Sequence, residues 1–199
     1  MEIRDIKREV KSLPCLKDDV KGFRNNYLKP IRANSNKHMP FLKDLDNQTK
    51  EKLNELLKQA HLHLDNLEQS HVLNDKLEQY SRHLVELKLA HFRGDEFKSK
   101  VLTKQLATDP FLNLRATVTQ VKQTKVAADK LSSHYEEIND LLHKELPLEH
   151  ALFFMQLPHQ KFLSNLIETS KSHEKITRNI ARHFVKIAAM KTIPKSRKK

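Results

Sequence analysis

The sequence predicts an all-α protein: a long antiparallel helical hairpin of coiled-coil type, an additional C-terminal helix packed on it, and short N-terminal helices. Three observations predict this fold class. The 199 residues include only two glycines and seven prolines, whereas a sheet protein needs frequent tight turns. Apolar residues recur at intervals of three and four over most of the chain, which is the period of an amphipathic helix. Finally, residues 44–93 contain neither proline nor glycine.

The first 43 residues are predicted to form two short helices and a linker. Two runs of apolar residues with helical spacing meet near Leu13 and Pro14, where a proline favours a new helix start. The first run is Ile3, Ile6, Val10 and Leu13, and the second is Leu16, Val20, Phe23 and Tyr27. The pattern is lost in residues 29–47, which contain Pro30 and Pro40. We therefore expect a loop or linker there.

Residues 44–157 are predicted to form the hairpin, and its first arm runs to residue 93. One apolar seam is followed by a second that is one residue out of step with it. The first seam is Leu53, Leu57, Ala60, Leu64 and Leu67, and the second is Leu73, Leu77, Tyr80, Leu84 and Leu87. A helix of about 50 residues would be about 75 Å long. A globular core cannot cover such a length, so another long helix must lie against it.

The hairpin is predicted to turn at Gly94 and Asp95, where glycine can end one helix and aspartate can cap the next. The return arm extends to about residue 145 and is interrupted at Asp109 and Pro110, a cap and a first helical position. Its seam is Leu114, Val118, Val121, Ala128, Leu131, Tyr135, Ile138 and Leu142. A short helix within residues 148–156, between two prolines, is expected to close one end of the bundle.

The last helix is predicted over residues 158–191, followed by a disordered basic tail at 192–199. Its apolar seam is Phe162, Leu166, Ile176, Ile180, Phe184 and Ile187. Residues 171–199 contain ten lysines and arginines but one acidic residue, so most of the net charge of +12 lies there. Solubility alone does not require charge to be concentrated in one element.

The basic residues of this helix form one stripe opposite its apolar seam. On a helical wheel they fall within a sector of about 80° and extend about 22 Å along the axis. They are Lys171, Lys175, Arg178, Arg182 and Lys186, and the tail adds Lys195, Arg197, Lys198 and Lys199. Charges spaced in this way can follow a row of phosphates without reading bases. A solvated outer face, neutralised by acidic residues of a neighbouring helix, remains the alternative interpretation of the stripe.

The leading functional hypothesis is a non-enzymatic helical binding or scaffold protein whose basic helix and tail grip a polyanion, most plausibly nucleic-acid backbone. The alternative is a coiled-coil structural adaptor that binds a partner helical protein or forms a homodimer. An anionic membrane surface is less favoured, because the final helix has no tryptophan and its apolar face looks matched to the hairpin. No uncharged apolar segment is long enough to cross a membrane. With a charged N-terminus, this gives the expectation of a cytoplasmic protein.

Several kinds of chemistry find no support in the sequence. There is no glycine-rich phosphate loop, nucleophile elbow or HExxH motif, so neither a cofactor nor catalysis is expected. Twelve histidines include only two carboxylate pairs of the di-iron type, Glu68 with His71 and Asp140 with His143, and no metal site is predicted. His71, His173 and His183 are instead expected at helix seams. The single cysteine, Cys15, is expected to be a packing residue.

Overall fold

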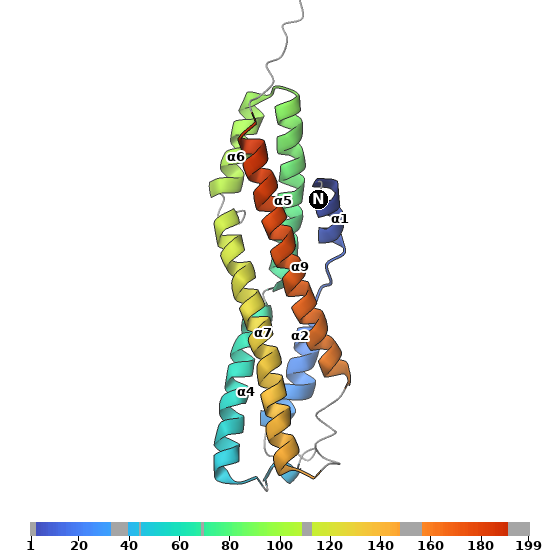
Figure 1. Ribbon diagram of the computed structural model, residues 1–199, viewed down its shortest axis with the longest axis vertical. Coiled ribbons are helices and arrows are strands. Elements are labelled where there is room, and N and C mark those ends of the chain that lie inside the picture. Colours follow the sequence, from blue (N-terminus) through green and yellow to red (C-terminus); the bar gives the residue numbers. More distant parts are fainter. Residues whose placement is uncertain are drawn as a thin grey trace, which may run out of the picture. The chain divides into compact units, whose positions relative to one another are not determined.

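A computed structural model describes residues 3–32, 40–43, 45–68, 70–108, 113–147 and 157–190, and all regular structure in these ranges is helical (Figure 1). This confirms the predicted all-α class. The short N-terminal elements are α1 (Ile3–Lys11), α2 (Lys17–Phe23), the π-helix η1 (Arg24–Leu28), α3 (Lys29–Arg32) and the 3₁₀ turn η2 (Pro40–Lys43). The longer elements are α4 (Asn47–Glu68), α5 (Ser70–Phe92), α6 (Glu96–Thr108), α7 (Leu114–Glu145) and α9 (Leu157–Ala188).

The chain divides into two compact units, each assembled from separate stretches of sequence. Unit 1 comprises Met1–Pro14, Val72–Lys122 and Lys171–Lys199, and unit 2 comprises Cys15–His71 and Gln123–Ser170. Helices α7 and α9 each contribute residues to both units, whereas α1 and α6 belong to unit 1 and α2 belongs to unit 2. Each unit has its own hydrophobic core.

Unit 1 packs α1, α5, α6 and the C-terminal half of α9 around one core (Figure 1). Every predicted seam residue of α5 is fully buried: Leu73, Leu77, Tyr80, Leu84 and Leu87. Side-chain hydrogen bonds fix an antiparallel register between α5 and the start of α7. Lys76 Nζ donates to Gln120 Oε1 at 3.0 Å, and the hydroxyls of Tyr80 and Thr117 lie 3.3 Å apart.

The hairpin turn forms where it was predicted. Gly94 has a φ of 66°, which a residue with a Cβ adopts only with strain. Its amide bonds to the carbonyl of His91 at 3.2 Å, and the next amide, of Asp95, bonds to the carbonyl of Ala90 at 2.9 Å. This pair of hydrogen bonds is a Schellman motif. The Asp95 carboxylate then accepts a bond from the Lys98 amide at 3.0 Å and so caps α6.

Unit 2 packs α4 against the C-terminal part of α7, with α2, η1 and the start of α9 completing the core. The predicted seam of α4 is buried throughout: Leu53, Leu57, Ala60, Leu64 and Leu67. The rings of His63 and His134 stack with their centroids 5.4 Å apart and so place α4 beside α7. The two helices run in opposite directions here (Figure 1). Tyr27 is buried and donates its hydroxyl proton to Asn139 Oδ1 at 2.9 Å. Burial raises the pKa of Tyr27 well above its usual value of 10.0.

Several predicted details were wrong. The expected loop begins with the helical turn α3 and later contains η2, and Ile31, Leu42 and Leu45 nearby are buried in the core of unit 2. Such short turns carry too few residues to show a period. By contrast, the predicted long first arm is helical at every described residue from Asn47 to Phe92, as α4 and α5 on either side of Gln69, which is not among the described residues. On α7 the buried seam position is Thr117 rather than the half-buried Val118.

Two predicted features lie outside the described residues. These are the interruption at Asp109 and Pro110 and the closing helix within 148–156. The cap that the structure does describe for α7 is Asn113. Its side-chain oxygen accepts a hydrogen bond from the Ala116 amide at 3.0 Å, which is the geometry of an N-cap.

Candidate polyanion-binding surface

Helix α9 exposes the predicted basic stripe because its opposite face is committed to the core. Ile176, Ile180 and Ile187 are buried in unit 1, and Phe184 is half-buried against them. The positions on the far side of the helix are all exposed: Lys171, Lys175, Arg178, Arg182 and Lys186. The five side chains thus form one solvent-facing row within unit 1. The tail residues Lys195, Arg197, Lys198 and Lys199 lie outside the described residues.

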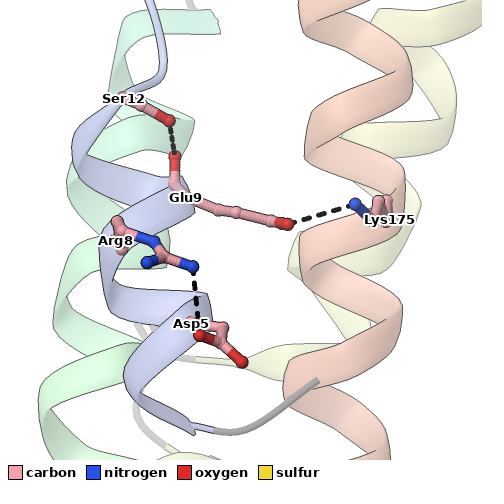
Figure 2. A network of polar contacts seen from close by, with 5 residues as sticks. All are labelled: Asp5, Arg8, Glu9, Ser12 and Lys175. Atoms are coloured by element: carbon pink, nitrogen blue, oxygen red, sulfur yellow. Dashed lines mark hydrogen bonds and ion pairs between the residues drawn. The ribbon is translucent and has the colours of Figure 1, made fainter.

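Two members of the stripe form ion pairs. Lys175 Nζ lies 3.1 Å from Glu9 Oε1 of α1, as Figure 2 shows. Arg178 lies 2.9 Å from Glu174 Oε1, one turn earlier on α9. The lysine and arginine side chains are more than 60% exposed in both pairs, so solvent screens these attractions. For Lys171, Arg182 and Lys186, no ion pair with another described residue is present.

Helix α1 brings this carboxylate to the stripe by packing against α5 and α9. Ile3, Ile6 and Val10 are buried on one side of α1, which leaves Glu9 directed towards α9 (Figure 2). The other carboxylate in this view, Asp5, instead pairs with Arg8 of the same helix at 3.2 Å. Glu9 therefore brings a carboxylate of α1 to the basic stripe.

The net positive charge of the chain lies in unit 1. The stretches of unit 1 contain 23 lysines and arginines against 10 acidic residues, whereas those of unit 2 contain 14 against 15. The net charge of unit 1 therefore exceeds that of the whole chain, and unit 2 is close to neutral. Such an asymmetry raises the local concentration of anions around one unit only.

The middle of α9 is held by a buried histidine. His173 is 2% exposed, and its Nε2 lies 2.7 Å from Asn74 Oδ1 of α5. The amide nitrogen of Asn74 in turn donates to the Pro14 carbonyl at 3.2 Å. Because an amide oxygen only accepts, Nε2 carries the proton. Burial lowers the pKa of His173 from its usual 6.5 to about 4, which keeps the ring neutral at pH 7.

The structure tests the predicted seam position of His183 but not that of His71. His183 is half-buried on α9, and the side chain of His71 is not among those described. Of the carboxylate pairs considered for a di-iron site, Glu68 with His71 includes this undescribed side chain, and Asp140 with His143 has no third ligand among the described residues. In the described part of the chain, no group of three or more His, Cys, Asp or Glu side chains is placed to hold a metal ion. Cys15, expected to pack, is exposed.

Sequence reasoning missed two features of unit 1. Near the hairpin turn, Phe92 and Phe97 are 64% and 80% exposed. In the same unit, Lys100 and Lys104 of α6 line a groove together with Ala188 and Met190 at the end of α9. The spacing of Lys100 and Lys104 placed them on one helix face, but only the packing of α6 beside α9 creates the groove.

Fold and surface together define a helical protein with one strongly basic unit and one nearly neutral unit. No family model matches the chain, and neither the curated proteins nor the solved structures include a significantly similar one. Within the described ranges, no helix combines the length and the apolar character needed to span a membrane.

Proposed function

We propose that this is a non-enzymatic helical binding protein whose α9 stripe grips the phosphate backbone of a nucleic acid with little sequence preference. The observation that carries the proposal is the exposed row of five basic residues on the unit that holds the excess positive charge. The row is about 22 Å long, with charges about 5 to 6 Å apart. Lysines and arginines arranged in this way neutralise phosphates and release counterions, which supplies affinity independent of sequence.

The buried face of α9 argues for a phosphate backbone rather than a lipid surface. An amphipathic helix binds a membrane interface through its apolar face. In unit 1 that face is occupied, because Ile176, Ile180 and Ile187 are buried in the core. The side of α9 that remains exposed carries the basic stripe, which suits a partner that binds through charge, such as a row of phosphates.

The test is a triple substitution of Lys175, Arg178 and Arg182 by glutamine. Binding to an oligonucleotide should weaken sharply while the circular dichroism spectrum stays helical. In the parent protein, affinity should fall steeply with added salt. The slope of log affinity against log salt should become shallower by roughly 2 to 3 in the variant, at about 0.7 to 0.9 per lost contact.

A matched control removes the same charge from the other unit. Lys52, Lys144 and Lys161 are exposed residues of unit 2, and their joint replacement by glutamine should leave the slope nearly unchanged. Equal weakening by both triple variants would mean that net charge, rather than the stripe, drives binding. Unchanged binding in the stripe variant would refute the proposal.

A second candidate function, a structural adaptor, is favoured by the exposed Phe92 and Phe97 on either side of the hairpin turn. Large aromatic side chains left in water are typical of protein interaction sites. Under this alternative, the Phe92→Ser and Phe97→Ser variant would lose a helical protein partner or a homodimer, and nucleic-acid binding would be weak from the start. Sedimentation of both proteins over a range of concentrations tests the homodimer.

A further inference from the structure

A groove of about 630 Å³ lies in unit 1 between α6 and the C-terminal end of α9. Lys100 and Lys104 line one side, one helical turn apart on α6, and both are exposed. Ala188 and Met190 line the other side. The groove is a tertiary feature, because its walls are more than 80 residues apart in the sequence.

Some polar groups of the groove already have hydrogen-bond partners within the protein, and others are available to a ligand. The hydroxyls of Thr103 and Thr108 donate to the carbonyls of Ser99 and Lys104, each at 2.8 Å. Ser99 Oγ lies 2.9 Å from His91 Nε2. These hydroxyls are therefore occupied within the protein. The ammonium groups of Lys100 and Lys104 form no ion pair with a described residue, so they are the donors that the groove offers to a ligand.

The neighbouring lysine of α6 shows the contrast. Lys98 Nζ lies 3.9 Å from Glu86 Oε2 of α5, so its charge is partly compensated within the hairpin. Lys100 and Lys104 lie on the side of α6 that lines the groove. The groove also contains one acidic residue, Glu96. Two lysines against one carboxylate leave the groove positive and suited to an anion.

The groove lies close to the C-terminal end of the stripe along α9, but on another side of the helix. Ala188 follows Lys186, the last described residue of the stripe, by two positions, which is about 3 Å of helical rise and about 200° of rotation, so a bound backbone reaches the groove by crossing over the end of α9. We propose that the groove extends the phosphate-binding surface from α9 onto α6, with Lys100 and Lys104 contacting the backbone of the same nucleic acid that the stripe holds. This inference rests on the proposed function of the stripe and adds a second binding element to it.

The test replaces Lys100 and Lys104 together by glutamine in the full-length protein. The probe is an oligonucleotide long enough to pass beyond the stripe, of about 20 nucleotides, in single-stranded and duplex form. The salt slope should become shallower by about 1.4 to 1.8, and affinity at 0.1 M salt should fall on the order of tenfold. Both changes should add to those of the stripe variant.

The control for total charge is the joint replacement of Lys52 and Lys144 in unit 2 by glutamine, which removes the same two charges. Circular dichroism and melting temperature check that both double variants remain folded. Parental affinity and slope in the Lys100 and Lys104 variant would overturn the inference, as would equal weakening by the control. If the stripe variant weakens binding and the groove variant does not, only the groove is refuted; if the stripe variant binds normally, the proposed function fails.

Discussion

The buried His173 makes the stability of unit 1 depend on pH in a window that can be calculated. The unfolded chain binds a proton at the ordinary histidine pKa of 6.5, whereas the folded protein resists protonation until about pH 4. Above pH 6.5 both states are neutral, so no stability is lost. As pH falls below 6.5, the unfolded state gains a proton that the folded state refuses, and stability falls until about pH 4.

The size of the effect follows from the two pKa values. Each pH unit between them costs about 1.4 kcal/mol, so the free energy of unfolding should fall by about 2 kcal/mol between pH 7 and pH 5. This is a large share of the 5 to 15 kcal/mol typical of a folded domain. The structural cause is specific. Nδ1 of His173 is buried without a hydrogen bond to any described residue, so a proton there would be an unpaired buried donor.

The assay is urea unfolding at several pH values, followed by far-ultraviolet circular dichroism, for the parent and a His173→Gln variant. Glutamine can still donate to Asn74 but does not titrate. Burial also lowers the pKa values of His63 and His159 in unit 2, and their contribution is common to both proteins. The difference between the two curves therefore isolates His173. Parallel curves from pH 7 to pH 5 would refute the reasoning.

Three further predictions concern charge, turns and the seam. Replacing Glu9 by glutamine releases Lys175 and should raise oligonucleotide affinity about two- to fivefold. The Asp5→Asn variant removes a carboxylate that pairs with Arg8 of the same helix and should change the affinity less; equal effects would mean that the contact with α9 is irrelevant. Alanine at the two glycines should change the stability of the fold in opposite directions. Gly94→Ala should lower it by about 1 to 2 kcal/mol because of the positive φ of Gly94, whereas Gly22→Ala, inside α2 with open space at its Cβ, should raise it by about 0.5 to 1 kcal/mol. Thermal melts of both variants test this. Leu64→Pro should cost about 3 kcal/mol or more, and a variant that melts like the parent would show that α4 does not continue through residue 64.

The apolar seams could be predicted because leucines at helical spacing form one apolar face, which is stable only when it is buried against another helix. All ten predicted seam positions of α4 and α5 are buried. Polar seam positions could not be predicted in the same way. Thr117, Thr124 and Thr177 are buried, but a threonine has no preference strong enough to place it inward. A buried threonine can be identified only by its place in an uninterrupted repeat of positions three and four residues apart. That repeat can be traced only after its apolar members are known.

The basic stripe could also be predicted, because it belongs to one helix and depends only on the 3.6-residue period. Its electrostatic partners could not. Glu9 and Lys175 are separated by 166 residues, and no local pattern in the sequence brings them together. The same holds for Lys100 and Lys104, whose groove exists because α6 packs beside the end of α9.

The apolar seams change at the positions where the chain passes from one unit to the other. The seam slips by one residue between Leu67 and Leu73, and on α9 the apolar seam is replaced by the buried polar residues Thr169, Ser170 and His173. Leu67 and Leu166 before these changes belong to the core of unit 2, whereas Leu77 and Ile176 after them belong to the core of unit 1. The excess positive charge belongs to unit 1, and the stripe residues are exposed there. We therefore expect substitutions in the stripe to alter binding without disturbing the core of unit 2.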